Sequence, residues 1–187
     1  MRAQFFLNRP RIIRSSIFFI MVFISLSSSA YCQTNGLSIG YGVGNLNPHN
    51  GFGKIPNNLG HEFLYLSYFH GFRLSQNGQI VLEPFVSYTY RTLSGFDLGV
   101  NLLYQYHFWK WNSLKNSLFF NIGTGGVYTT VDFTDQGSDF LFILQAGVGL
   151  KVDKYFIEFR HRHYSNGGTA RPNVGVETEF LSVGFYF

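Results

Sequence analysis

The sequence has only one cysteine, Cys32, among its 187 residues. A single thiol excludes a disulfide within the chain. A chain of this length is long enough for one domain and short for two. We therefore expect a single domain whose fold contains no internal disulfide.

Charged residues are also scarce, at 13% of the sequence, where an ordinary soluble domain has about 25%. Lysine and arginine together number 14 and aspartate and glutamate 10, but four of the arginines lie in the first thirty residues. The rest of the chain carries 10 charges of each sign and is formally neutral. With no basic surplus, the composition argues against a nucleic-acid partner.

Long apolar runs are missing after residue 30, where none approaches the roughly 18 to 20 residues of a membrane-spanning helix. The first thirty residues predict a secretory signal peptide. It begins with a positively charged segment that contains Arg2, Arg9, Arg11 and Arg14. An apolar run follows at residues 17–26, which is too short to span a membrane, and the small residues Ser28 and Ala30 mark a cleavage site. We expect cleavage after Ala30, or after Cys32, and assign residues 31–187 to the folded domain.

Aromatic residues are abundant, at 19%, and apolar and polar residues alternate along most of the chain. Residues 98–108, for example, place leucine, valine, tyrosine and phenylalanine on one face and glycine, asparagine, glutamine and histidine on the other. This period of two is typical of half-buried strands. Eight strands are predicted, near residues 36–46, 61–74, 79–92, 95–109, 116–130, 138–152, 154–166 and 175–187.

Eight antiparallel strands close into a barrel whose interior side chains just fill. A soluble barrel is apolar inside, whereas a membrane barrel has an apolar exterior with aromatic girdles and a small and polar interior. Here the less apolar face is rich in glycine, asparagine, glutamine, serine and threonine, and the chain ends "VGFYF". We therefore predict an all-β fold, an eight-stranded antiparallel transmembrane β-barrel of the bacterial outer membrane.

Chemically capable residues fall on the predicted lipid-facing side of the last hairpin. In "FRHRHYSN", His163 and Ser165 share a face with Ile157 and Phe159, and parity from Phe187 places Glu177 on that face too. A hairpin centred near Ala170 sets His163 opposite Glu177. With both termini in the periplasm, His163 lies about 20 Å up an apolar band about 25 Å tall, near the outer-leaflet interface.

Serine, histidine and a carboxylate are the groups of nucleophilic ester hydrolysis. A histidine takes the proton of the serine hydroxyl, and the carboxylate fixes the tautomer of that histidine. Asn166, beside the serine, could offer a side-chain or backbone N–H to the oxyanion. This chemistry needs no cofactor.

The pattern "HYSN" with Glu177 twelve residues after Ser165 resembles the active site of the lipid A 3-O-deacylases (PagL-like), which are eight-stranded outer-membrane esterases. The resemblance covers about the last thirty residues and implies Ser165 as nucleophile, His163 as base, Glu177 as orienting acid and Asn166 as oxyanion contributor. It also implies removal of a 3-O-hydroxyacyl chain from the lipid A of lipopolysaccharide. The second acid, Glu179, leaves the choice of carboxylate open.

Other interpretations remain at this point. A non-catalytic adhesin or structural barrel, or an outer-membrane phospholipase, has the same architecture. His161 and His163 form a metal-binding H-x-H pair only if a third ligand exists, and the sequence offers none. We expect Glu158, Arg160 and Arg162 to form an ion-paired network in the lumen. Three cations in or beside predicted external loops are either solvated charges or partners of lipid A phosphates: Lys54, Arg91 and Arg171.

Overall fold

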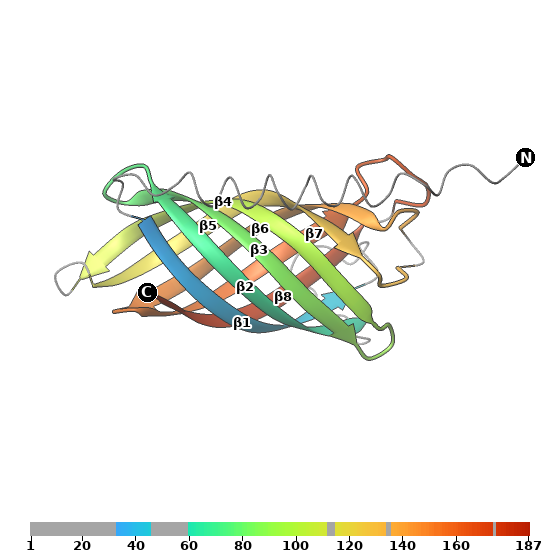
Figure 1. The fold of residues 1–187 in the computed structure, drawn as a ribbon, viewed down its shortest axis with the longest axis horizontal. Coiled ribbons are helices and arrows are strands. Elements are labelled where there is room, and N and C mark those ends of the chain that lie inside the picture. The colour runs from blue at the N-terminus through green and yellow to red at the C-terminus, as the bar shows by residue number, and fades with distance from the viewer. Residues whose placement is uncertain (1–32, 46–59, 112–114, 134–135, 174) are drawn as a thin grey trace, which may run out of the picture. The chain divides into compact units, whose positions relative to one another are not determined.

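The structure, a computed structural model, describes residues 33–45, 60–111, 115–133, 136–173 and 175–187. These residues form a closed antiparallel barrel in which each strand pairs with the next and β1 pairs with β8 (Figure 1). The eight strands are β1 (Gln33–Asn45), β2 (His61–Arg73), β3 (Gly78–Tyr90), β4 (Gly95–Trp111), β5 (Asn116–Thr129), β6 (Phe140–Val152), β7 (Tyr155–Ser165) and β8 (Val176–Tyr186). The predicted fold class is thereby confirmed.

Some predictions fall outside the described residues. They are the signal peptide, both of its cleavage positions and Lys54. Within the described residues, no helix has the length and apolar character needed to cross a membrane.

The alternation seen in the sequence becomes an inside and an outside of the barrel. Along β6, Phe142, Leu144 and Val148 are exposed, whereas Ile143 and Gln145 are buried. The same alternation places apolar side chains on the outside of every strand from β1 to β8. Burying so much apolar surface in lipid stabilises a barrel, while the same surface in water would be an aggregation hazard.

The barrel interior holds a charged network at mid-height. Arg160 donates to Glu83 at 2.6 Å and to Glu158 at 2.8 Å. Arg162, fully buried, donates to Gln145 at 2.8 Å and to the Tyr65 hydroxyl at 2.9 Å. The expected lumen network is confirmed, with Glu83 as an added member. Two buried acids and two buried arginines leave it formally neutral, which is what makes the burial of these charges tolerable.

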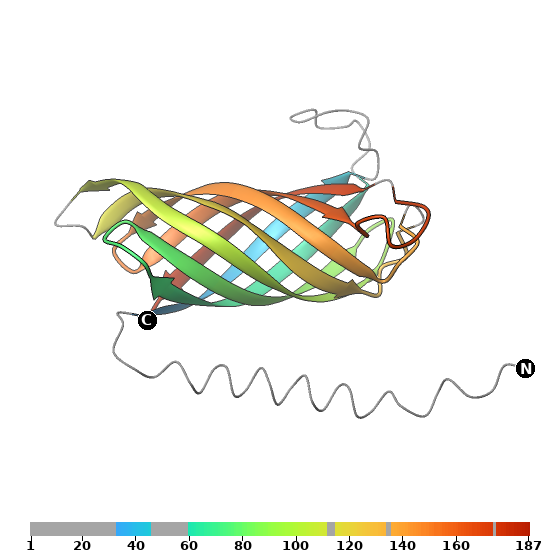
Figure 2. The same ribbon diagram turned by 90° about the horizontal axis from the view of Figure 1, so that it is seen from above.

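The connections define two ends of the barrel. The loop end carries residues 91–94, 130–133, 136–139, 166–173 and 175, and the turn end carries residues 74–77 and 153–154 together with the start of β1 and the end of β8. Figure 2 shows the loop between β7 and β8 and the C-terminus at opposite ends of the barrel. Both termini of the barrel domain therefore lie at the turn end, which is the periplasmic end in outer-membrane barrels of even strand number.

Candidate active site

The last hairpin places the predicted site residues on the outside of the barrel, near the loop end. Along β7, Arg162 and Tyr164 are buried in the lumen, so His163 and Ser165 project outward. On β8, Val176 and Thr178 are buried, and Glu177 projects outward. The register pairs His163 directly with Glu177, the pairing expected from a hairpin centred near Ala170.

His163 and Glu177 form a close pair. Nδ1 of His163 lies 2.6 Å from Oε1 of Glu177. With the proton on Nδ1, the ring donates to the carboxylate, and Nε2 keeps its lone pair to accept a proton. The side chains of His163 and Glu177 are 37% and 31% exposed, so the pair is accessible from the outside of the barrel. Among the two acids considered in the sequence analysis, Glu177 is therefore the one in direct contact with His163.

A second histidine, missed as a site residue in the sequence, contacts the same carboxylate. Nε2 of His161 lies 3.0 Å from Oε2 of Glu177, and its Nδ1 lies 3.8 Å from Oε1 of Glu179. Each oxygen of Glu177 therefore has its own imidazole partner. Glu179 pairs with His161 in the sheet register and is the more remote acid from His163. The sequence feature that could have identified His161 is its spacing of two residues from His163 on β7, opposite Glu177 and Glu179 at the same spacing on β8.

Ser165 is the last residue of β7 and lies two positions beyond His163 on the same face. Residues so spaced are about 7 Å apart along a strand, within reach of a rotated imidazole and hydroxyl. No hydrogen bond between the two is among the contacts of the described residues. On the other side, β6 pairs Phe142 with Ser165 and Leu144 with His163, and both apolar side chains are exposed. Ser165 thus borders an apolar strip.

Gly175 determines the space around the His163 ring. It has a left-handed φ of 84°, and a Cβ at this position would lie 2.8 Å from Cε1 of His163. That distance is shorter than a carbon–carbon contact allows. A glycine is therefore required here both for backbone conformation and for room beside the imidazole.

Asn166 is fully buried and structures the loop that follows Ser165. Its Nδ2 donates to the carbonyls of Ala170 and Pro172 at 3.1 and 2.9 Å, and its backbone N–H donates to Oδ1 of Asn173 at 2.9 Å. Its Oδ1 accepts from the Gly168 N–H at 2.9 Å. In this arrangement all of its N–H groups are used within the loop. The predicted oxyanion role would require some of these bonds to break, whereas the observed contacts make Asn166 a loop-positioning residue.

The predicted phosphate-binding cations are dispersed around the loop end. Arg91 is exposed and forms an ion pair with Glu62 of β2, and Arg171 is exposed in the loop between β7 and β8. Neither is brought into contact with His163, Ser165 or Glu177 by any interaction of the described residues. Among all the residues that the structure describes, no group of three or more histidine, cysteine or acidic side chains is arranged to hold a metal ion.

Comparisons with known proteins identify the family and the fold. Residues 70–186 match the profile of the lipid A 3-O-deacylase (PagL) family. No curated protein matches the chain. The crystal structure of the outer membrane enzyme PagL superposes with a TM-score of 0.61 and 21% identity, over 80% of this chain and 98% of that one. Neisserial surface protein A (NspA) superposes with a TM-score of 0.55 and 10% identity, over 83% of this chain and 97% of that one.

The two structural likenesses show the shared barrel fold, and the family profile carries the assignment further. The matched segment spans β3 to β8 in full, including His161, His163, Ser165 and the acids of β8. It covers more than half of the chain. The protein is therefore an outer-membrane ester hydrolase that belongs to the lipid A 3-O-deacylase (PagL) family.

Proposed function

We propose that this chain removes the ester-linked 3-O-hydroxyacyl group from lipid A by a Ser165–His163–Glu177 mechanism. The observation that carries the proposal is the 2.6 Å contact between His163 Nδ1 and Glu177 Oε1 on the outer face, beside Ser165, in a chain of this family. The pair lies near the loop end of β7, which supports a site at the outer-leaflet interface. Lipid A is anchored there with its acyl esters at the boundary between sugar and hydrocarbon.

The reaction proceeds in two stages. In the first, Oγ of Ser165 attacks the ester carbonyl carbon while Nε2 of His163 takes the hydroxyl proton. The carbon–oxygen bond to the sugar then breaks, and His163 returns the proton to the departing sugar oxygen. In the second, His163 deprotonates a water that attacks the acyl carbon; the bond from this carbon to Oγ of Ser165 then breaks, His163 returns the proton to Oγ, and the hydroxy fatty acid leaves. Glu177 remains ionised throughout and holds the Nδ1–H of His163.

The surroundings of Ser165 suit a lipid substrate. Phe142 and Leu144 continue the outer surface from Ser165 and His163 onto β6 and are exposed to the hydrocarbon. An acyl chain bound along this strip keeps its apolar contacts with lipid and protein while its ester reaches Ser165. Arg91 and Arg171, exposed at the same end, are suited to contact the lipid A phosphates from above the membrane plane.

Mass spectrometry of lipid A tests the proposed function directly. Purified barrel in detergent is incubated with hexa-acylated lipid A and, separately, with a glycerophospholipid. We expect lipid A to lose one 3-hydroxyacyl chain and the glycerophospholipid to remain intact. Fatty-acid release from the glycerophospholipid alone would instead identify a phospholipase. No release from either substrate by a folded barrel would favour a non-catalytic one.

His161 is expected to act as a positioning residue for Glu177. The change His161→Ala removes the contact of Nε2 with Oε2 and lets the carboxylate rotate. Because an ion pair between partly exposed side chains contributes about 0.2–1 kcal/mol, kcat should fall by up to about fivefold. His161→Gln keeps an N–H at a similar reach and should restore most of the rate. KM should change little in either variant, since His161 lies behind the acid. Equal losses in the two variants would contradict the positioning role.

Gly175 offers a prediction with a matched control. In Gly175→Ala, the new methyl group displaces the His163 ring, and misplacement of a reacting group by about 1 Å lowers the rate about a hundredfold. Gly168 has a similar φ of 79°, but a Cβ there meets nothing within 4 Å. Gly168→Ala therefore has the same backbone strain without the clash. We expect both variants to lose some stability in denaturant unfolding and only Gly175→Ala to lose deacylation. Similar activities would exclude contact with His163 as the cause.

A further inference from the structure

Positive charge collects at the turn end of the barrel, far from the candidate active site. Every lysine that the structure describes lies there: Lys110, Lys115, Lys151 and Lys154. Arg73, the last residue of β2, joins them. Since the folded domain is formally neutral overall, this is a segregation of charge and not a consequence of composition. A concentration of one sign at a concave surface attracts ligands of the other sign.

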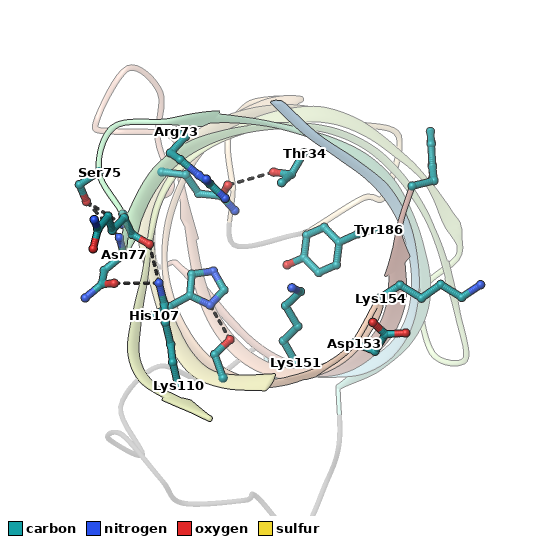
Figure 3. Close-up of a pocket in the computed structure, with 15 residues that line it drawn as sticks. Thr34, Arg73, Ser75, Asn77, His107, Lys110, Lys151, Asp153, Lys154 and Tyr186 are labelled. Atoms are coloured by element: carbon teal, nitrogen blue, oxygen red, sulfur yellow. Dashed lines mark hydrogen bonds between the residues drawn. The ribbon is translucent and has the colours of Figure 1, made fainter. Parts of the chain in front are cut away.

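The cations surround a cavity at this end of the lumen. It has a volume of about 580 Å³ and is lined by residues from seven strands and two turns, among them Arg73, Lys110, Lys151 and Lys154. Asp153 is the one carboxylate side chain in the lining. Figure 3 shows Arg73, Lys151, His107 and Tyr186 directed into the mouth of the barrel. This volume falls within the range of small-molecule sites.

Buried polar side chains line the part of the cavity that lies further into the barrel. Gln79 accepts a hydrogen bond from Thr34 at 2.9 Å and donates to Gln105, the residue opposite it on β4. A further cavity inside the barrel has a volume of about 20 Å³. The charged cavity, which we call the cup, lies at the turn end, whereas the candidate active site lies on the outer face near the loop end.

Within the described residues, no side-chain carboxylate oxygen lies within 4 Å of the charged nitrogens of Arg73, Lys110 or Lys151. Lys110 donates to the side chain of Asn77 at 2.7 Å, and the ammonium of Lys151 lies 5.4 Å from the ring centroid of Tyr186. His107 uses Nδ1 to contact Ser117 at 2.7 Å. Converging cations that outnumber the single acidic side chain of the lining, Asp153, repel one another, and an anion bound among them relieves that repulsion.

We propose that this cup binds a small organic phosphate. A phosphate monoester carries nearly two negative charges and three acceptor oxygens, so it can engage Arg73, Lys110 and Lys151 together, whereas a single carboxylate neutralises one of them. The planar guanidinium of Arg73 matches a phosphate bidentately. A bare phosphate leaves most of the cup empty, and the polar Gln79 layer and the Tyr186 ring suit an attached glycerol or sugar. The proposal is independent of the esterase chemistry, because the cup lies at the opposite end of the barrel.

Isothermal titration calorimetry tests the proposal on the intact barrel in octyl glucoside, an uncharged and phosphate-free detergent. The probes are glycerol 3-phosphate, inorganic phosphate and glycerol. We expect saturable one-to-one binding of glycerol 3-phosphate, weaker binding of inorganic phosphate, no heat from glycerol, and an affinity that falls as salt is raised. In the Arg73→Gln/Lys151→Gln double variant, Kd should rise at least about tenfold, since two charge-assisted contacts are lost.

The matched control is Lys115→Gln, which removes an exposed cation at the same end of the barrel that does not line the cup. Its affinity should equal that of the native barrel. Equal affinities in the cup variant and the native barrel would overturn the proposal. So would the absence of saturable binding of either phosphate probe up to about 10 mM, a concentration at which even a millimolar site saturates. Circular dichroism confirms that each variant is folded before titration.

A second arm distinguishes the two sources of an organic phosphate, a soluble metabolite and a lipid headgroup. The same titration is repeated on barrels reconstituted in nanodiscs of phosphatidylcholine or of phosphatidylglycerol. If headgroups reach the cup, glycerol 3-phosphate should bind the native barrel more weakly in phosphatidylglycerol than in phosphatidylcholine, at a salt concentration that screens the surface charge of the discs. Equal binding in both discs would assign the cup to soluble organic phosphates.

Discussion

Replacing Ser165 with alanine should abolish release of the 3-hydroxyacyl chain from lipid A, while the barrel folds normally. The change removes the one hydroxyl that shares the outer face with His163 at a spacing of two residues. Loss of a nucleophile in such a triad lowers kcat by about a thousandfold or more. The change is structurally mild, because Ser165 is partly exposed at the end of its strand and no hydrogen bond of its side chain appears among the described contacts. Mass spectrometry of lipid A after incubation with matched amounts of folded barrel measures the effect.

Ser94→Ala is the matched control for this experiment. Ser94 is exposed in the loop between β3 and β4, at the same end of the barrel, and should be dispensable. His163→Gln combined with Ser165→Ala should cost no more than Ser165→Ala alone, because residues that act as a unit are not additive. If Ser165→Ala kept its activity, the nucleophile would be another group. If the losses of the two changes were additive, His163 and Ser165 would act independently of each other.

Much of the fold follows from a period of two, because a strand exposes alternate residues to alternate environments. The pattern in β6, with phenylalanine and leucine alternating with glutamine and glycine, predicts both the strand and its lipid-facing side. Parity then extends the inference to single residues: His163 and Glu177 are outward in the structure as in the sequence analysis, and their register follows from the hairpin. Local geometry is sufficient at each of these steps.

Contacts that depend on the closure of the barrel cannot be predicted from the period-two alternation of the sequence. Arg160 and Glu83 are 77 residues apart and meet across the lumen. Likewise Arg73, Lys110 and Lys151 share a cavity because three separate strands end at the same rim. The alternation does not predict side-chain rotamers either. Parity places His161 and Glu179 on the outer face, but it does not tell that His161 contacts Glu177 or that Asn166 turns its donors into the loop.

The largest stability effect is expected from Glu83→Ala. Glu83 is buried and accepts hydrogen bonds from Arg160 at 2.6 Å, Asn101 at 2.9 Å and Ser67 at 3.0 Å. It is also the only acid within 4.0 Å of Arg162 in the described part of the chain. Its removal leaves two buried arginines facing Glu158 alone, so one positive charge in the lumen has no counterion. Breaking a buried ion pair from one side lowers the free energy of unfolding by about 3–5 kcal/mol.

Urea unfolding of the barrel in phospholipid vesicles, followed by the fluorescence of the exposed Trp109 and Trp111, measures this change. Glu62→Ala is the control, because Glu62 also pairs with an arginine, Arg91. The side chain of Arg91 is 67% exposed, so water solvates its charge when Glu62 is removed. We expect a much smaller change there. The double change Glu83→Met/Arg160→Met should be milder than Glu83→Ala, provided that the loss comes from an uncompensated charge and not from a cavity. If the double change were the more destabilising of the two, packing and not charge balance would be the main contribution of Glu83 to the lumen.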